Sequence, residues 1–132
     1  MIMKAAKGQG IISTMNLLSD DLDEIDWEIM GGNETYVSNN WYGKGNTSQH
    51  NGEYPALNGA MDDFHNYTVD WNSERLQWIL DGNVVREIPY AESGEYPQTP
   101  SFLKIGIWAG GDPTLPQGTI DWAGGETDYD KA

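Results

Sequence analysis

The chain has 132 residues, enough for one domain with a hydrophobic core and too few for two. Its formal net charge of −14 argues against nucleic acids and anionic membranes as partners, because both require a basic surface, whereas a neutral polysaccharide is compatible with it. The sequence has no cysteine, which excludes disulfides and thiolate metal sites, and no segment reaches the ~20 apolar residues of a membrane span.

The first half of the chain alternates polar and apolar residues with a period of two, which predicts strands. The turn residues Ser19-Asp20-Asp21 and Gly31-Gly32-Asn33 separate these segments. Residues 43–63 contain four glycines and Pro55, and we expect them to form a long loop that is either functional or mobile. The strands predicted in this half are residues 11–18, 22–30 and 35–42.

The second half continues the β pattern. Asp81-Gly82 joins two alternating segments, which predicts a hairpin with a type I′ turn, because both turn residues then need a positive φ. Residues 89–100 hold three prolines and are expected to be loop. The predicted strands are residues 65–71, 75–80, 83–88, 102–109, which reads as buried, and a short last strand at 119–123. Short antiparallel strands at this spacing predict an all-β sandwich or jelly roll.

One predicted strand carries three carboxylates. Side chains of a strand alternate between its two faces, so Glu24, Asp26 and Glu28 share one face and the apolar residues between them point into a core. Acidic residues are poor strand formers, and adjacent like charges repel. Three carboxylates in a row therefore indicate a role that outweighs this cost.

The spacing suits a retaining glycosidase. The Cα atoms of Glu24 and Glu28 are ~13 Å apart in a strand, and inward-leaning side chains can bring the carboxyls to about 5–5.5 Å. One carboxylate attacks the anomeric carbon and the other protonates the leaving oxygen, with its pKa raised by negative neighbours. Asp26 can orient the nucleophile. A solvated acidic strand and a Ca²⁺ site remain open as alternatives.

A family resemblance favours catalysis. The run Asp23-Glu24-Ile25-Asp26-Trp27-Glu28, followed by Gly31-Gly32, resembles the catalytic strand of glycoside hydrolase family 16. That family includes lichenases, laminarinases, plant xyloglucan transglycosylases and fungal Crh transglycosylases. The uninterrupted spacing is similar to the lichenase, xyloglucan and Crh branch. Further similar segments, of which the last two look specifically Crh-like, are residues 3–11, 38–45, 64–71, 107–113 and 118–125.

The resemblance implies a concanavalin-like jelly-roll sandwich with a glycan cleft across its concave sheet. It also implies that residues 1–132 are a partial catalytic domain that links chitin to cell-wall β-glucan by transglycosylation. Glu24 would be the nucleophile, Glu28 the general acid/base that also contacts substrate, and Asp26 the helper. Lys104, Trp108 and Thr119 match positions that contact the sugar chain. No cofactor and no metal are expected.

The predicted strand 102–109 is compatible with these contacts. Alternation places Lys104 and Trp108 on one face, where tryptophan can stack on a sugar ring and lysine can donate to hydroxyls. Trp108 as a packed core residue and Lys104 as a surface residue remain the alternatives. The opposite face is expected to lie in the core and holds Leu103, Ile105 and Ile107.

Four other aromatic residues are candidates for the cleft or for the core. His65 and Tyr67 could line the cleft, although each alone could equally be an ordinary core or surface residue. Trp71 and Trp78 are assigned to packing.

The extent of the resemblance shapes the remaining expectations. A complete domain of this family needs roughly 200–250 residues, and the similarity begins at an interior strand and stops short of the usual closing strand, so we expect strands of the complete domain to be absent at both ends. The resemblance implies an extracellular, cell-wall location, and three N-x-S/T sequons, at Asn33, Asn46 and Asn66, favour a secreted glycoprotein, although residues 1–7 lack the apolar run of a signal peptide.

Two rival functions remain. The first is a β-glucan hydrolase of the lichenase type, against which the Crh-like segments 107–113 and 118–125 argue. The second is a non-enzymatic glycan-binding jelly roll, against which the intact set of three carboxylates argues.

Overall fold

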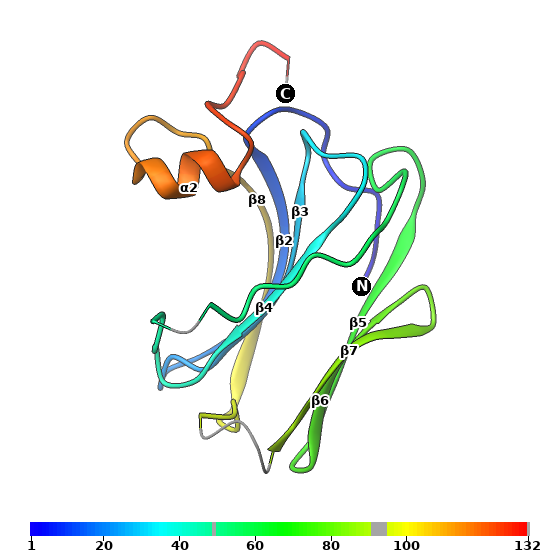
Figure 1. Ribbon diagram of the computed structural model, residues 1–132, viewed down its shortest axis with the longest axis vertical. Coiled ribbons are helices and arrows are strands. Elements are labelled where there is room, and N and C mark those ends of the chain that lie inside the picture. The colour runs from blue at the N-terminus through cyan, green and yellow to red at the C-terminus, as the bar shows by residue number, and fades with distance from the viewer. Residues whose placement is uncertain (49, 91–94, 132) are drawn as a thin grey trace.

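The protein folds into two four-stranded antiparallel sheets that face each other, as the computed structural model in Figure 1 shows for residues 1–48, 50–90 and 95–131. The strand order is β4-β3-β2-β8 in the first sheet and β1-β5-β6-β7 in the second. The first sheet contains β2 (Ile11–Ser19), β3 (Glu24–Met30), β4 (Ser38–Tyr42) and β8 (Ser101–Ala109). The second contains β1 (Ile2–Met3), β5 (His65–Trp71), β6 (Arg75–Leu80) and β7 (Asn83–Pro89).

The predicted all-β sandwich is therefore confirmed, and so is its hairpin. Asp81 and Gly82 have φ angles of 49° and 81°, the positive values that a type I′ turn requires. The expected loops 43–63 and 89–100 include residue 49 and residues 91–94, which lie outside the described residues.

The short strand expected at 119–123 is wrong, because the chain forms the helix α2 (Gln117–Trp122) there. Pro116 caps its start, and the Pro116 carbonyl accepts the amides of Thr119 and Ile120 at 2.9 and 3.2 Å. A proline at the start and glycines after the end are helix boundary signals. Figure 1 shows α2 beside the end of β8, on the side of the first sheet away from the second.

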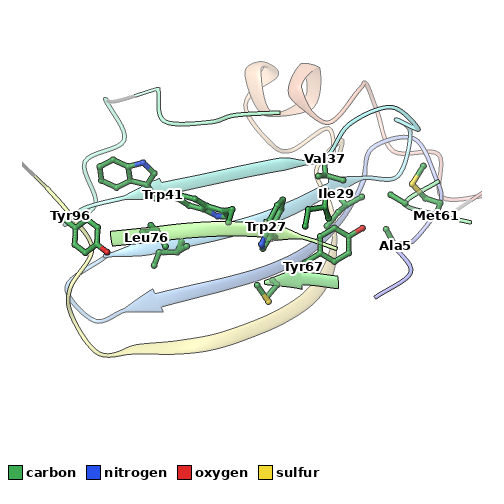
Figure 2. Close-up of a cluster of buried hydrophobic side chains, with 14 residues drawn as sticks. Ala5, Trp27, Ile29, Val37, Trp41, Met61, Tyr67, Leu76 and Tyr96 are labelled. Atoms are coloured by element: carbon green, nitrogen blue, oxygen red, sulfur yellow. The ribbon is translucent and has the colours of Figure 1, made fainter. Parts of the chain in front are cut away.

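The core between the sheets holds the carboxylate strand in place. Ile25, Trp27 and Ile29 on β3 are at most 1% exposed, as their alternation predicted. Figure 2 shows Trp27 and Ile29 within the cluster of buried hydrophobic side chains. Two tryptophans tie the sheets together: Trp27 Nε1 donates to the Thr68 carbonyl at 3.1 Å, and Trp78 Nε1 donates to the Asp26 carbonyl at 2.9 Å. Since the apolar face of β3 is fixed inward, its acidic face has to point away from the core.

The burial predicted for residues 102–109 is wrong, although the alternation is right. Leu103, Ile105 and Ile107 pair with residues of β2 whose side chains face the core, so their own side chains are on that same face of the sheet. They are nevertheless 60%, 61% and 66% exposed. The reason is topological: β8 is the outermost strand of the first sheet, and nothing in the described part of the chain covers this face of it. The result is an apolar, nine-residue edge strand.

We expect the 132-residue chain to self-associate through this strand, because exposed hydrophobic edge strands pair with other chains. Ile105→Lys should lower the associated fraction measured by light scattering, since it puts a charge in the middle of the exposed face. Val84→Lys is the matched control, because Val84 is 53% exposed on β7 and lies outside this face. A wild-type chain that is monomeric and unfolds cooperatively would contradict the expectation.

Candidate active site

The three carboxylates of β3 lie on the outer face of the first sheet, near its centre. β3 pairs with β4 on one side and with β2 on the other. Asp26 lies opposite Asn40 and Asn16, and Glu28 lies opposite Ser38 and Thr14. The carboxylates are thus surrounded by hydroxyl and amide groups, which suit contacts with a polyhydroxylated ligand.

This polar face is the floor of a groove. The larger part has a volume of about 680 Å³, and an adjoining hollow has about 330 Å³. Glu28 and Trp108 line both parts, and Glu24 and Lys104 line the smaller one. The larger part is further bounded by a group of residues from β4, the loop after it and α2: Ser38, Asn40, Tyr42, Thr47, His50, Asn51, Gly52, Tyr54, Gly118, Thr119 and Trp122.

Glu28 has the electrostatics of a general acid. Burial raises its pKa to about 7, and the charge of Glu24 adds to this effect. A carboxyl with such a pKa is still partly protonated at neutral pH, so it can give a proton to a leaving oxygen and take one back afterwards.

Asp26 is suited to support Glu24. Its side chain is 3% exposed, and burial raises its pKa well above the usual value, as do the charges of Glu24 and Glu28 and a hydrogen bond with Glu24. A protonated Asp26 can donate this hydrogen bond to the Glu24 carboxylate, which fixes the orientation of the carboxylate on the floor of the groove.

Asp23 has a structural role that the sequence pattern did not reveal. Its carboxylate accepts the amides of Lys44, Gln98 and Thr99 at 2.9, 2.9 and 3.0 Å, and the Thr99 hydroxyl at 2.6 Å. Burial alone would raise the pKa of Asp23, but these hydrogen bonds outweigh it and lower the pKa. Asp23 thereby anchors the start of β3 to the segments that follow β4 and precede β8.

The residues predicted to contact sugar reach the groove from β8 and α2. Lys104 lies opposite Asn16, on the same face as the carboxylates. Trp108 is 36% exposed rather than packed in the core, and its Nε1 donates to Thr14 Oγ1 at 2.9 Å. The ring of Trp108 stacks on Trp122 with the centroids 6.0 Å apart and the planes at 20°. Thr119 and Trp122 are three residues apart, and residues at this spacing lie on the same side of a helix. Both therefore line the groove from α2.

His65 and Tyr67 do not line the cleft, so this suggestion is wrong. Both lie on β5 in the second sheet. Tyr67 is fully buried, with its ring centroid 5.6 Å from that of Trp27, and His65 Nδ1 lies 2.7 Å from Asp81 Oδ2. Trp78 is fully buried, so its assignment to packing is confirmed.

Sequence reasoning missed several residues of the groove. Asn40 and Tyr42 follow from the alternation of β4, and Asn40 Nδ2 donates to the Tyr42 hydroxyl at 2.9 Å. Trp122 was missed because residues 119–123 were expected to form a strand, whereas Pro116 is a signal for the start of a helix. His50 and Tyr54 come from an irregular segment whose path no local pattern indicates.

Two properties of the described residues complete the site. None of their helices is long and apolar enough to cross a membrane. Among the same residues, no group of three or more His, Cys, Asp or Glu side chains is arranged to hold a metal ion.

The comparisons with known proteins define the class of this fold and site. A family model described as glycosyl hydrolases family 16 matches residues 1–124. The chain therefore belongs to glycoside hydrolase family 16, and the sandwich described above is the jelly roll of that family.

Within this class the chain is similar to Crh-like proteins. Crh-like protein 2 of Botryotinia fuckeliana is 53% identical over 137 residues, which cover 99% of this chain and 30% of the relative. The solved structure of a Crh5 transglycosylase in complex with NAG superposes with a TM-score of 0.95 at 48% identity, covering 98% of this chain and 55% of the other. The solved structure of a prokaryotic β-1,3-1,4-glucanase (lichenase) from a mouse hindgut metagenome superposes with a TM-score of 0.78 at 27% identity, covering 95% of this chain and 56% of the other. The chain thus spans about a third of its curated relative and about half of the solved chains.

Proposed function

We propose that this protein is a retaining glycosidase and transglycosylase of the fungal cell wall, which cleaves chitin-type β-1,4 chains and transfers them to β-glucan. The observation that carries the proposal is the position of Glu24 and Glu28 in one groove, with Asp26 buried between them on the same face of β3 and with burial and charge raising the pKa of Glu28 to about 7. Similarity to a solved transglycosylase over 98% of the chain supports the same reading.

The reaction follows from the positions of the carboxylates. A Glu24 oxygen attacks the anomeric carbon while the glycosidic C–O bond breaks, and Glu28 gives its proton to the leaving oxygen. Asp26 holds the attacking carboxylate. The glycosyl ester on Glu24 is then attacked by an acceptor hydroxyl whose proton goes to Glu28, which restores both groups. Each of these two displacements inverts the anomeric carbon, so its configuration is unchanged after both.

The groove is suited to a sugar acceptor. Trp108 offers an aromatic face backed by Trp122, and aromatic faces bind the apolar C–H faces of pyranose rings. The solved relative is described as a complex with NAG, the repeating unit of chitin, which supports a chitin-type donor here. The sugar contacts of Lys104 and Thr119, and an extracellular cell-wall location, are part of the same proposal.

Product analysis tests the function. The chain is incubated with chitin oligomers, with and without a fluorescently labelled β-glucan acceptor, and the products are separated by size. Labelled products longer than the acceptor support transfer. Only shorter products at high acceptor concentration would favour hydrolysis, the activity of the lichenase-type rival. Binding without any product would favour the non-enzymatic glycan-binding jelly roll.

Trp108→Ala is expected to weaken glycan binding and to lower the fraction of transfer products. The lost stacking corresponds to about 1–3 kcal/mol of binding free energy. Isothermal titration with chitin oligomers measures the first effect, and time-resolved product sizes measure the second. Phe64→Ala is the control, since Phe64 is 70% exposed and is not among the residues that line the groove. If both variants bind chitin oligomers with equal affinity, Trp108 does not contribute to glycan binding.

A further inference from the structure

A buried arginine of the second sheet reaches the groove wall of the first. Arg86 lies on β7, and its side chain is only 9% exposed. The pairing of β6 with β7 is irregular at this point: Trp78 lies opposite Arg86, the next pair is Ile79 with Val84, and Val85 is the extra residue of a bulge. Since Trp78 is fully buried, the residue opposite it also faces the interior, so the bulge turns Arg86 inward.

The guanidinium contacts three oxygens. Nη1 donates to Asn39 Oδ1 at 2.8 Å and to the Asn51 carbonyl at 2.6 Å. Nε lies 3.5 Å from Glu53 Oε1, and the guanidinium carbon lies 4.9 Å from the centroid of the Trp78 ring. Arginine can use several donors of its planar group and stack on an aromatic ring at the same time, which lysine cannot do.

Two of these acceptors, on Asn51 and Glu53, belong to one wall of the groove, which we define as residues 50–54, and the third, on Asn39, belongs to β4. The wall lies along the free side of β4: the amide of Asn39 donates to the Glu53 carbonyl at 3.0 Å, and the amide of Glu53 donates to the Asn39 carbonyl at 2.9 Å. His50, Asn51, Gly52 and Tyr54 from this wall line the groove together with Trp108 and Trp122. Asn51 Nδ2 also donates to the Trp41 carbonyl of β4 at 3.1 Å. Asn51 is thus bound both by β4 and by Arg86.

We propose that Arg86 is a positioning residue that fixes this wall against β4 and thereby sets the width of the groove in which the sugar chain binds. The consequence for sugar binding rests on the proposed function, whereas the fixing of the wall does not. Arg86 lies beneath the wall, in the other sheet, and contacts neither Glu24 nor Glu28. Its loss therefore alters the fit of the sugar chain and leaves the reacting groups in place.

The test compares Arg86→Met and Arg86→Lys with Arg75→Met. Arg75 is the matched control, because it is an arginine of the same sheet that pairs with Asp70 at 2.9 Å and is not among the residues lining the groove. Hydrogen exchange of the Asn39 and Glu53 amides is measured together with steady-state kinetics on chitin oligomers. We expect Arg86→Met to speed exchange at these two amides about tenfold or more, with no change at the Trp27 amide.

The kinetic expectation is a KM for chitin oligomers raised roughly tenfold to a hundredfold, with a change in kcat below about twofold. Arg86→Lys keeps the positive charge but not the paired contacts, so its amide exchange and KM should lie between those of wild type and Arg86→Met. Arg75→Met should match wild type in both measurements.

The outcomes separate this proposal from the proposed function. If the wild type turns over no glycan, the proposed function fails and amide exchange alone decides the role of Arg86. Wild-type protection of the Asn39 and Glu53 amides in Arg86→Met would overturn the positioning role. Global unfolding of both Arg86 variants, or exchange that is faster throughout the core, would also overturn it, since Arg86 would then support the fold as a whole.

Discussion

Replacing Glu24 by Gln is expected to lower turnover of cell-wall glycan by several orders of magnitude while glycan binding remains measurable. The amide is nearly isosteric with the carboxylate, so the groove keeps its shape, but it cannot form the glycosyl ester. Initial rates with chitin oligomers measure the first effect, and isothermal titration measures the second. A variant that keeps more than roughly a tenth of the wild-type rate would rule out Glu24 as nucleophile.

Two further variants sharpen this experiment. Glu34→Gln removes a carboxylate that is 62% exposed and pairs with Lys7 at the surface, so its turnover should equal that of wild type. Glu24→Ala leaves space for an external anion. With azide present it should give a glycosyl azide of inverted configuration, because a single displacement then replaces two. No azide product, together with low activity, would point to damage of the fold rather than loss of the nucleophile.

Replacing Glu28 by Ala should distinguish substrates by their leaving groups. Native glycan needs a proton on the departing oxygen, so its cleavage should fall by about 10²–10⁴-fold. An aryl glycoside with a strongly acidic phenol leaves without protonation, and its first step should keep most of its rate. Single-turnover release of the phenol measures this step. An equal loss on both substrates would contradict the role of Glu28 as general acid.

The pH dependence gives an independent reading of the same residue. Burial and the charge of Glu24 raise the pKa of Glu28 to about 7, so the acid form is lost as the pH rises through about 7. The kcat/KM of wild type on native glycan should therefore decline above that pH. The aryl glycoside should show no such decline in its first step. Glu28→Ala should lack the decline on either substrate.

The sequence predicted the carboxylate strand because two independent patterns agree there. Alternation alone places Glu24, Asp26 and Glu28 on one face of β3, and the burial of Ile25 and Trp27 confirms this facing. The family resemblance then gave these side chains their proposed roles. Neither pattern indicated how strongly the site is buried, which is the first cause of the raised pKa of Glu28.

Other parts of the site could not be read from local patterns. Alternation gave the right faces for Leu103 and Lys104, but the exposure of Leu103 depends on β8 being the outermost strand, and strand order is a long-range property. The position of Trp122 was missed because six residues are too few for a helical repeat to show, so the expected period of two was applied instead.

The sequence by itself thus determined the fold class, the hairpin at Asp81-Gly82 and the face on which the three carboxylates lie, because each depends on backbone periods and turn chemistry within a few residues. The tertiary structure alone decided the rest. Strand register brought Asn16 and Asn40 beside Asp26, α2 placed Trp122 against Trp108, and the bulge in β7 turned Arg86 toward Asn39. These contacts join residues that are distant in the chain, and they form only when whole sheets pack and bury their apolar faces.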